Sequence, residues 1–110
     1  TANQDVLSAL LPIVDDFDRG LAEIKKSEEQ AALFEGMKLI HDKLIATLNQ
    51  KGLVQVEVAA GDSFDADIHE AVTQIPAPDE SLKGKIIDVI EKGYQLGEKI
   101  IRYPKVVIGQ

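Results

Sequence analysis

The first half of the chain alternates between apolar and polar positions with the period of a helix. Apolar side chains recur at steps of three and four over residues 7–24 and again over residues 33–48, as on one face of an amphipathic helix. Pro12 lies inside the first seam. Because it removes a backbone hydrogen bond and crowds the carbonyl of Ser8, we expect a kink or a restart of the helix there.

The ends of the second helix are also marked. The segment Ser27–Gln30 predicts a capping box in which Ser27 is the N-cap. Gly52, between Lys51 and Leu53, is placed to end the helix. Gly36 interrupts it at a cost of about 1 kcal/mol relative to alanine, and either is simply tolerated or allows another backbone to approach closely.

Two such helices leave apolar surface uncovered. They share one groove, and each apolar stripe is wider than a single neighbouring helix can cover. Self-association into a dimeric four-helix bundle would bury the remainder, whereas the alternative is that the second half of the chain packs onto the helices. The residues expected at the dimer interface are Leu10, Val14, Phe17, Leu21, Met37, Ile40, Leu44 and Leu48.

After Gly52 the hydrophobic period changes from that of a helix to that of a strand. Residues 54–58 alternate strictly, and residues 85–91, apolar on both faces, are expected to form a central strand. Gly97-Glu98 suits a type II′ hairpin turn. Other strands are expected at residues 71–75, 93–96, 99–103 and 106–108, with a loop at 76–81 and an edge or bulge at Pro104. The fold class predicted is α+β: a helical dimerisation segment, residues 1–52, then a small mainly-β domain, residues 53–110.

Composition narrows the possible partners. The formal net charge is -7, so nucleic acid and anionic membrane surfaces would repel the chain. No apolar run approaches the roughly 18 residues of a membrane span, and cysteine is absent. A group of basic residues near the C-terminus is either a contact patch for a partner or a set of solvated strand edges; its members are Lys92, Lys99, Arg102 and Lys105.

One short segment carries groups that could do chemistry. Asp65, Asp67 and His69 could hold a metal or transfer protons, but the same residues are typical of a capped turn beside a structural histidine. His41, near the seam of the second helix, is expected to be a tolerated interface residue. No phosphate-binding loop, nucleophile elbow or zinc spacing occurs. We therefore expect no catalytic residue, no metal and no other cofactor.

Three stretches of the sequence form a gapped pattern: residues 10–19 (LLPIVDDFDR), Phe64-Asp65 followed by residues 69–72 (HEAV), and the C-terminal pattern Gly93-Tyr94, Glu98, Ile101-Arg102, Pro104, Val106 and Ile108. Together they resemble the GrpE family of nucleotide exchange factors. The chain departs from the family in two ways. Ala66 stands where many members carry proline, and the long N-terminal helix of the family is missing, so we expect a fragment that lacks its upstream portion.

The resemblance implies a function in protein binding. A GrpE-like protein binds the ATPase domain of a DnaK-type chaperone through its β-domain, favours the open conformer and promotes ADP release, without binding nucleotide itself. The setting implied is the bacterial cytoplasm or an organellar matrix. A passive dimeric adaptor without exchange activity is the alternative. The contact residues carried over from the family are Phe64, Ala66, Lys99, Arg102 and Ile108, although the alternation that puts Ile101 and Tyr103 opposite Arg102 also allows Arg102 a structural ion pair.

Overall fold

The computed structural model describes residues 2–110 and divides into two compact units. The first unit ends at Leu53 and the second begins at Val54. The long helices lie in the first unit, and all strand residues except Leu53 lie in the second. This arrangement confirms the α+β fold class. Neither of the long helices has the combination of length and hydrophobicity that a membrane crossing requires, within the part of the chain described.

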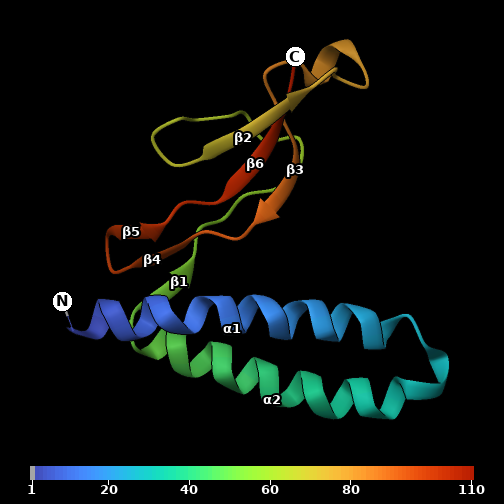
Figure 1. Cartoon of the computed structure of the whole chain (residues 1–110), viewed down its shortest axis with the longest axis vertical. Helices are drawn as coiled ribbons and strands as arrows, with labels where there is room; N and C mark the ends of the chain where they lie inside the picture. The colour runs from blue at the N-terminus through green and yellow to red at the C-terminus, as the bar shows by residue number, and fades with distance from the viewer. Residues whose placement is uncertain (1) are drawn as a thin grey trace. The chain divides into compact units, whose positions relative to one another are not determined.

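The first unit is a helical hairpin, in which α1 (Ala2–Lys25) and α2 (Ala31–Gln50) lie side by side (Figure 1). α1 continues without a break through Pro12, so the predicted restart is wrong. A helix-interior proline costs about 3 kcal/mol, but Leu11 and Val14 on either side of it are each only 1% exposed. Their burial holds this turn of the helix together, because helices in proteins are stabilised mainly by tertiary packing.

The predicted capping box at the start of α2 is also wrong. Ser27 has an extended backbone and makes no side-chain cap, and the 3₁₀ turn η1 (Glu28–Gln30) precedes α2. The N–H of Gln30 donates to the Ser27 carbonyl at 3.2 Å, so a backbone bond takes the place of the expected side-chain bond. The end of α2 is as predicted, since Gly52 has a left-handed φ of 92° and its N–H donates to the Asn49 carbonyl at 3.0 Å.

His41 ties the two helices together. Its Nε2 lies 2.7 Å from Asp18 Oδ1 on α1, and its Nδ1 lies 3.1 Å from Asp42 Oδ1. The ring also packs against Phe17, with 5.4 Å between ring centroids. The hydrogen bond from Lys38, assisted by the one from His41, holds the pKa of Asp42 below its ordinary value. His41 therefore contributes to the pairing of α1 with α2.

The second unit is built around strands that form two three-stranded sheets. β2 (Glu70–Ile75) pairs with β6 (Lys105–Gly109) in parallel, and β3 (Ile86–Glu91) pairs with β6 in antiparallel orientation. A short 3₁₀ turn, η2 (Glu80–Leu82), follows β2 and overlaps the end of the loop predicted at 76–81. One sheet has the order β1-β4-β5, and its strands are Leu53–Gln55, Tyr94–Leu96 and Lys99–Arg102. The other has the order β2-β6-β3 (Figure 1), and its strands are Glu70–Ile75, Lys105–Gly109 and Ile86–Glu91.

The first predicted strand is shorter than its alternating pattern suggested. β1 ends at Gln55, and the buried residues are Leu53 and Val56, which are three positions apart, while Val54 is 44% exposed. One further bond extends past the end of β1, since the Val56 N–H donates to the carbonyl of Gly93, directly before β4, at 2.9 Å. Alternation beyond Gln55 therefore does not correspond to a continued strand.

In the β2-β6-β3 sheet the central strand is β6, not the segment 85–91 that we predicted. Val106 and Val107 are adjacent and both buried, and since neighbouring strand residues point to opposite faces, both faces of β6 are covered. β3 is an edge strand, and its Ile90 is 59% exposed. Pro104, which has no backbone N–H to donate, lies just before β6 and not within it. Both edges of β6 can therefore pair with neighbouring strands.

The hairpin of β4 and β5 confirms the predicted turn position. The two strands pair in antiparallel orientation around Gly97 and Glu98. Gly97 has a φ of 61°, and no described residue other than glycine has a positive φ. This combination agrees with a type II′ turn and excludes type I′, which needs positive φ at both central residues.

Candidate partner-binding surface

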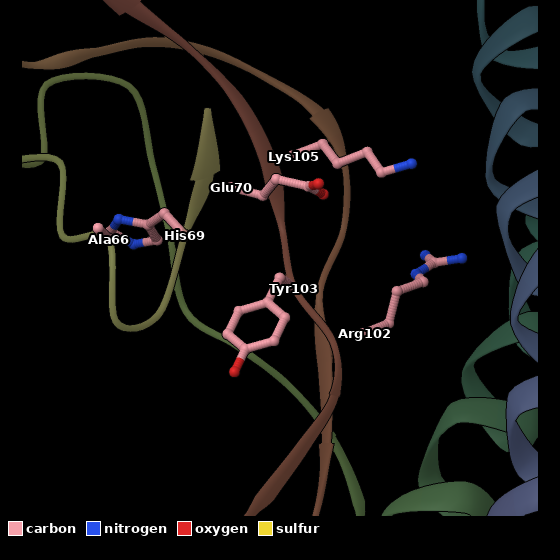
Figure 2. Close-up of a pocket in the computed structure, with 6 residues that line it drawn as sticks. All are labelled: Ala66, His69, Glu70, Arg102, Tyr103 and Lys105. Atoms are coloured by element: carbon pink, nitrogen blue, oxygen red, sulfur yellow. The ribbon is translucent and has the colours of Figure 1, made fainter. Parts of the chain in front are cut away.

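A pocket of about 300 Å³ lies on the β-unit, between the loop before β2 and the connection from β5 to β6 (Figure 2). It brings together segments that are far apart in the sequence. Its lining residues are Ala66, His69, Glu70, Arg102, Tyr103 and Lys105. Two of the predicted contact residues, Ala66 and Arg102, therefore share one site.

The loop that carries Ala66 is shaped by its own polar groups. The Asp67 N–H donates to Asp65 Oδ1 at 2.9 Å, and the Asp65 N–H donates to Nδ1 of His69 at 3.0 Å. His69 is only 6% exposed. Such bonds are typical of an Asx turn, and residues 2–110 contain no group of three or more potential metal ligands. The geometry of this cluster therefore agrees with a capped turn beside a structural histidine.

Phe64 packs at the base of the same loop. Its ring centroid lies 5.9 Å from that of His69, and its side chain is half-buried. The predicted contact residue Phe64 therefore packs against His69, which lines the pocket, but is not itself among the lining residues.

Arg102 is held by several partners within the β-unit. Its Nε and Nη2 donate to the Lys92 carbonyl at 2.9 and 2.7 Å, and its Nη1 lies 2.9 Å from Glu91 Oε1. The guanidinium also lies 5.4 Å from the centroid of the Tyr94 ring. The second carboxylate oxygen of Glu91 binds Lys105 Nζ at 3.1 Å. The ion pair that we had considered for Arg102 therefore exists.

The pocket has two chemically different sides. In Figure 2 the head groups of Arg102 and Lys105 point to the right, while the ring of Tyr103 extends downward and to the left, away from them. Tyr103 thus lies opposite Arg102, as the alternation predicted. One side carries charge and the other presents a half-exposed aromatic ring.

The remaining predicted contact residues lie outside this pocket. Lys99 is exposed at the start of β5, and Ile108 is half-buried in the central strand β6. Glu91 and Tyr103 are not among the predicted contact residues. The pairing of Glu91 with Lys105 depends on the register between β3 and β6, which no local sequence pattern reveals. Tyr103 could have been selected from the sequence, because it is the neighbour of the predicted contact residue Arg102.

A second hollow of about 300 Å³ lies on the helical hairpin. It is largely apolar, and its lining residues are Ile13, Asp16, Phe17, Gly20, Leu21, Ile24 and Met37. Phe17, Leu21 and Met37 are among the predicted dimer residues.

The other predicted dimer residues differ in exposure. Leu10 and Leu44 are half-buried and Ile40 is 60% exposed, whereas Val14 and Leu48 are already buried in a single copy of the chain. A second copy would therefore add little to the burial of those last two residues.

These features define a small α+β protein with an apolar groove on a helical hairpin and a charged pocket on a β-unit. The family model named GrpE matches residues 1–110. The chain belongs to the GrpE family.

Relatives named Protein GrpE cover nearly all of the chain. The one from Parabacteroides distasonis is 42% identical over 110 residues, which are 100% of this chain and 56% of that protein. Those from Porphyromonas gingivalis strain W83 and Bacteroides thetaiotaomicron are 43% and 40% identical, over 97% and 94% of this chain and 55% and 53% of their own lengths. The chain thus spans about half the length of the curated relatives it matches.

Proposed function

We propose that this chain acts as a nucleotide exchange factor whose β-unit binds the ATPase domain of a DnaK-type chaperone. Membership of the GrpE family supports this function. The structural observation that carries it is the pocket that joins Ala66, from the loop before β2, to Arg102, from the last hairpin. The proposed contact residues are Phe64, Ala66, Lys99, Arg102 and Ile108.

The mechanism is selective binding of one conformer. If the chain binds the open form of the ATPase domain better than the closed form, linkage requires that ADP affinity falls by the same factor. A hundredfold loss of ADP affinity needs about 2.7 kcal/mol of differential binding. A few well-placed contacts at a site of this kind can supply that energy.

This mechanism needs no covalent chemistry from the chain itself. In our proposal the chain binds neither nucleotide nor metal, requires no cofactor, and has neither nucleic acid nor a membrane as partner. The bacterial sources of its relatives favour the bacterial cytoplasm as its setting.

In this proposal the helical hairpin of α1 and α2 forms the dimer interface. The apolar groove along α1 and α2 is the surface that a second copy would cover, together with exposed apolar side chains such as Ile40 and Leu33. Packing of two hairpins as a four-helix bundle would remove this surface from water.

The exchange activity can be tested by stopped-flow release of a fluorescent ADP analogue from the chaperone. We expect the chain to accelerate release in a saturable way, because binding to the open conformer weakens the nucleotide. A longer protein with the family's N-terminal helix serves as the reference. Binding without acceleration by either protein would favour the passive adaptor, and absence of binding by both would contradict both functions.

The dimer can be tested with Leu44→Asp. Light scattering of the unaltered chain should give twice the monomer mass of 12.0 kDa, and the variant should shift toward the monomer because it would bury an unpaired carboxylate. Ala46→Asp is the matched control, since it introduces the same charge at an exposed position of α2. An unchanged mass for Leu44→Asp would show that this position lies outside the interface.

A further inference from the structure

Glu91 at the end of β3 lies between two cations. Its Oε1 is 2.9 Å from Arg102 Nη1 and its Oε2 is 3.1 Å from Lys105 Nζ. The Glu91 and Arg102 side chains are 26% and 18% exposed, so this pair is only partly screened by water, while that of Lys105 is 43% exposed. The register of β3 with β6 places Glu91 opposite Lys105. One carboxylate therefore occupies donors of both basic side chains.

The position of Arg102 does not depend on Glu91 alone. Two of its nitrogens donate to the Lys92 carbonyl at 2.9 and 2.7 Å, and the guanidinium lies near the Tyr94 ring. If the Glu91 charge were removed, these contacts would still hold the guanidinium in place. The main effect of Glu91 on Arg102 is therefore electrostatic.

We propose that Glu91 is an internal counter-ion that limits how tightly the basic pair, Arg102 and Lys105, binds an acidic surface of the chaperone ATPase domain. This inference rests on the proposed function. An incoming carboxylate must share or displace N–H donors that Glu91 already occupies. With Glu91 ionised, the three side chains carry a net charge of about +1 in place of +2.

A tethered competitor also assists dissociation. Glu91 stays beside the two cations at a high effective concentration, so it can reclaim them when a partner carboxylate moves away. An exchange factor must leave the chaperone after ADP has been released, and a competitor of this kind shortens the lifetime of the complex. Glu91 thus sets the affinity of the basic pair, although it need not touch the partner.

The test is Glu91→Gln, which keeps the shape and one acceptor oxygen but removes the charge. We expect its dissociation constant for the chaperone ATPase domain to fall by roughly three- to tenfold at low ionic strength. The gain should shrink at high salt, because screening weakens attraction between partly exposed charges. Biolayer interferometry at both salt concentrations gives the affinity and the two rate constants.

Matched variants separate this effect from the net charge of the chain. Glu98→Gln makes the same charge change at an exposed position of the β4–β5 turn, and should alter the affinity much less. Adding Lys105→Met to Glu91→Gln should cancel most of the gain. Lys105→Met alone leaves the pair of Arg102 and Glu91 in place and should weaken binding and its salt dependence, so it tests the basic pair even if Glu91→Gln fails to fold.

The outcomes distinguish the inference from the proposed function. If the unaltered chain binds the ATPase domain but Glu91→Gln binds no better, or gains no more than Glu98→Gln, the role of Glu91 is refuted and the function stands. If the unaltered chain and its longer relative both fail to bind, the proposed function is refuted, and this inference with it.

Discussion

Replacing Gly93 with alanine should destabilise the β-unit by about 3 kcal/mol or more. A Cβ at this position would lie 2.2 Å from Pro104 Cδ, 2.3 Å from Pro104 N and 2.8 Å from the Arg102 carbonyl oxygen. Two of these are backbone atoms and the third belongs to a rigid ring, so no side-chain rotation relieves the overlap. The connection between β5 and β6 would have to move, and with it the pocket.

Urea unfolding followed by circular dichroism measures this loss, and Gly36→Ala is the control. A methyl group added at Gly36 would have no described atom within 4 Å beyond its own helical turn, so the same exchange there should raise stability by up to about 1 kcal/mol. Within one copy of the chain, the close approach considered for Gly36 is therefore not found. A Gly93→Ala protein with an unchanged midpoint would show that Pro104 does not pack against Gly93.

Arg102→Lys should lower stability by about 2 kcal/mol and weaken chaperone binding, although the charge is retained. Arginine donates from Nε and Nη2 to the Lys92 carbonyl while Nη1 pairs with Glu91. A lysine ammonium has no planar fork and cannot reproduce these bonds in the same geometry. Hydrogen bonds that involve a charged group contribute about 1.5–3 kcal/mol each, which supports the size of the expected effect.

The control for this exchange is Lys105→Arg, which also conserves charge in the same cluster and should leave both quantities close to their original values. Urea unfolding reports stability, and interferometry with the ATPase domain reports binding. If Arg102→Lys matches the unaltered chain in both measurements, Arg102 contributes only its charge, and the bonds to Lys92 do not stabilise the unit.

Part of the candidate site was predictable from the resemblance to the GrpE family. Ala66 and Arg102 were selected from the sequence, and the structure places both at one pocket. The Asp65–His69 segment was recognised as chemically rich, but its role depended on geometry. The bond from the Asp65 N–H to His69 Nδ1 shows that the side chain of the histidine is engaged within the turn.

The sequence by itself determined the elements whose signals are local. The change of period after Gly52 separates helices from strands, and Gly97 marks the hairpin turn, because periodicity and backbone conformation are properties of neighbouring residues. The tertiary structure alone decided that β6 is central, that Glu91 meets Arg102 and Lys105, and that Pro104 crowds Gly93. Each of these joins residues from different elements, and two strands of similar hydrophobicity do not reveal which of them lies in the middle of a sheet.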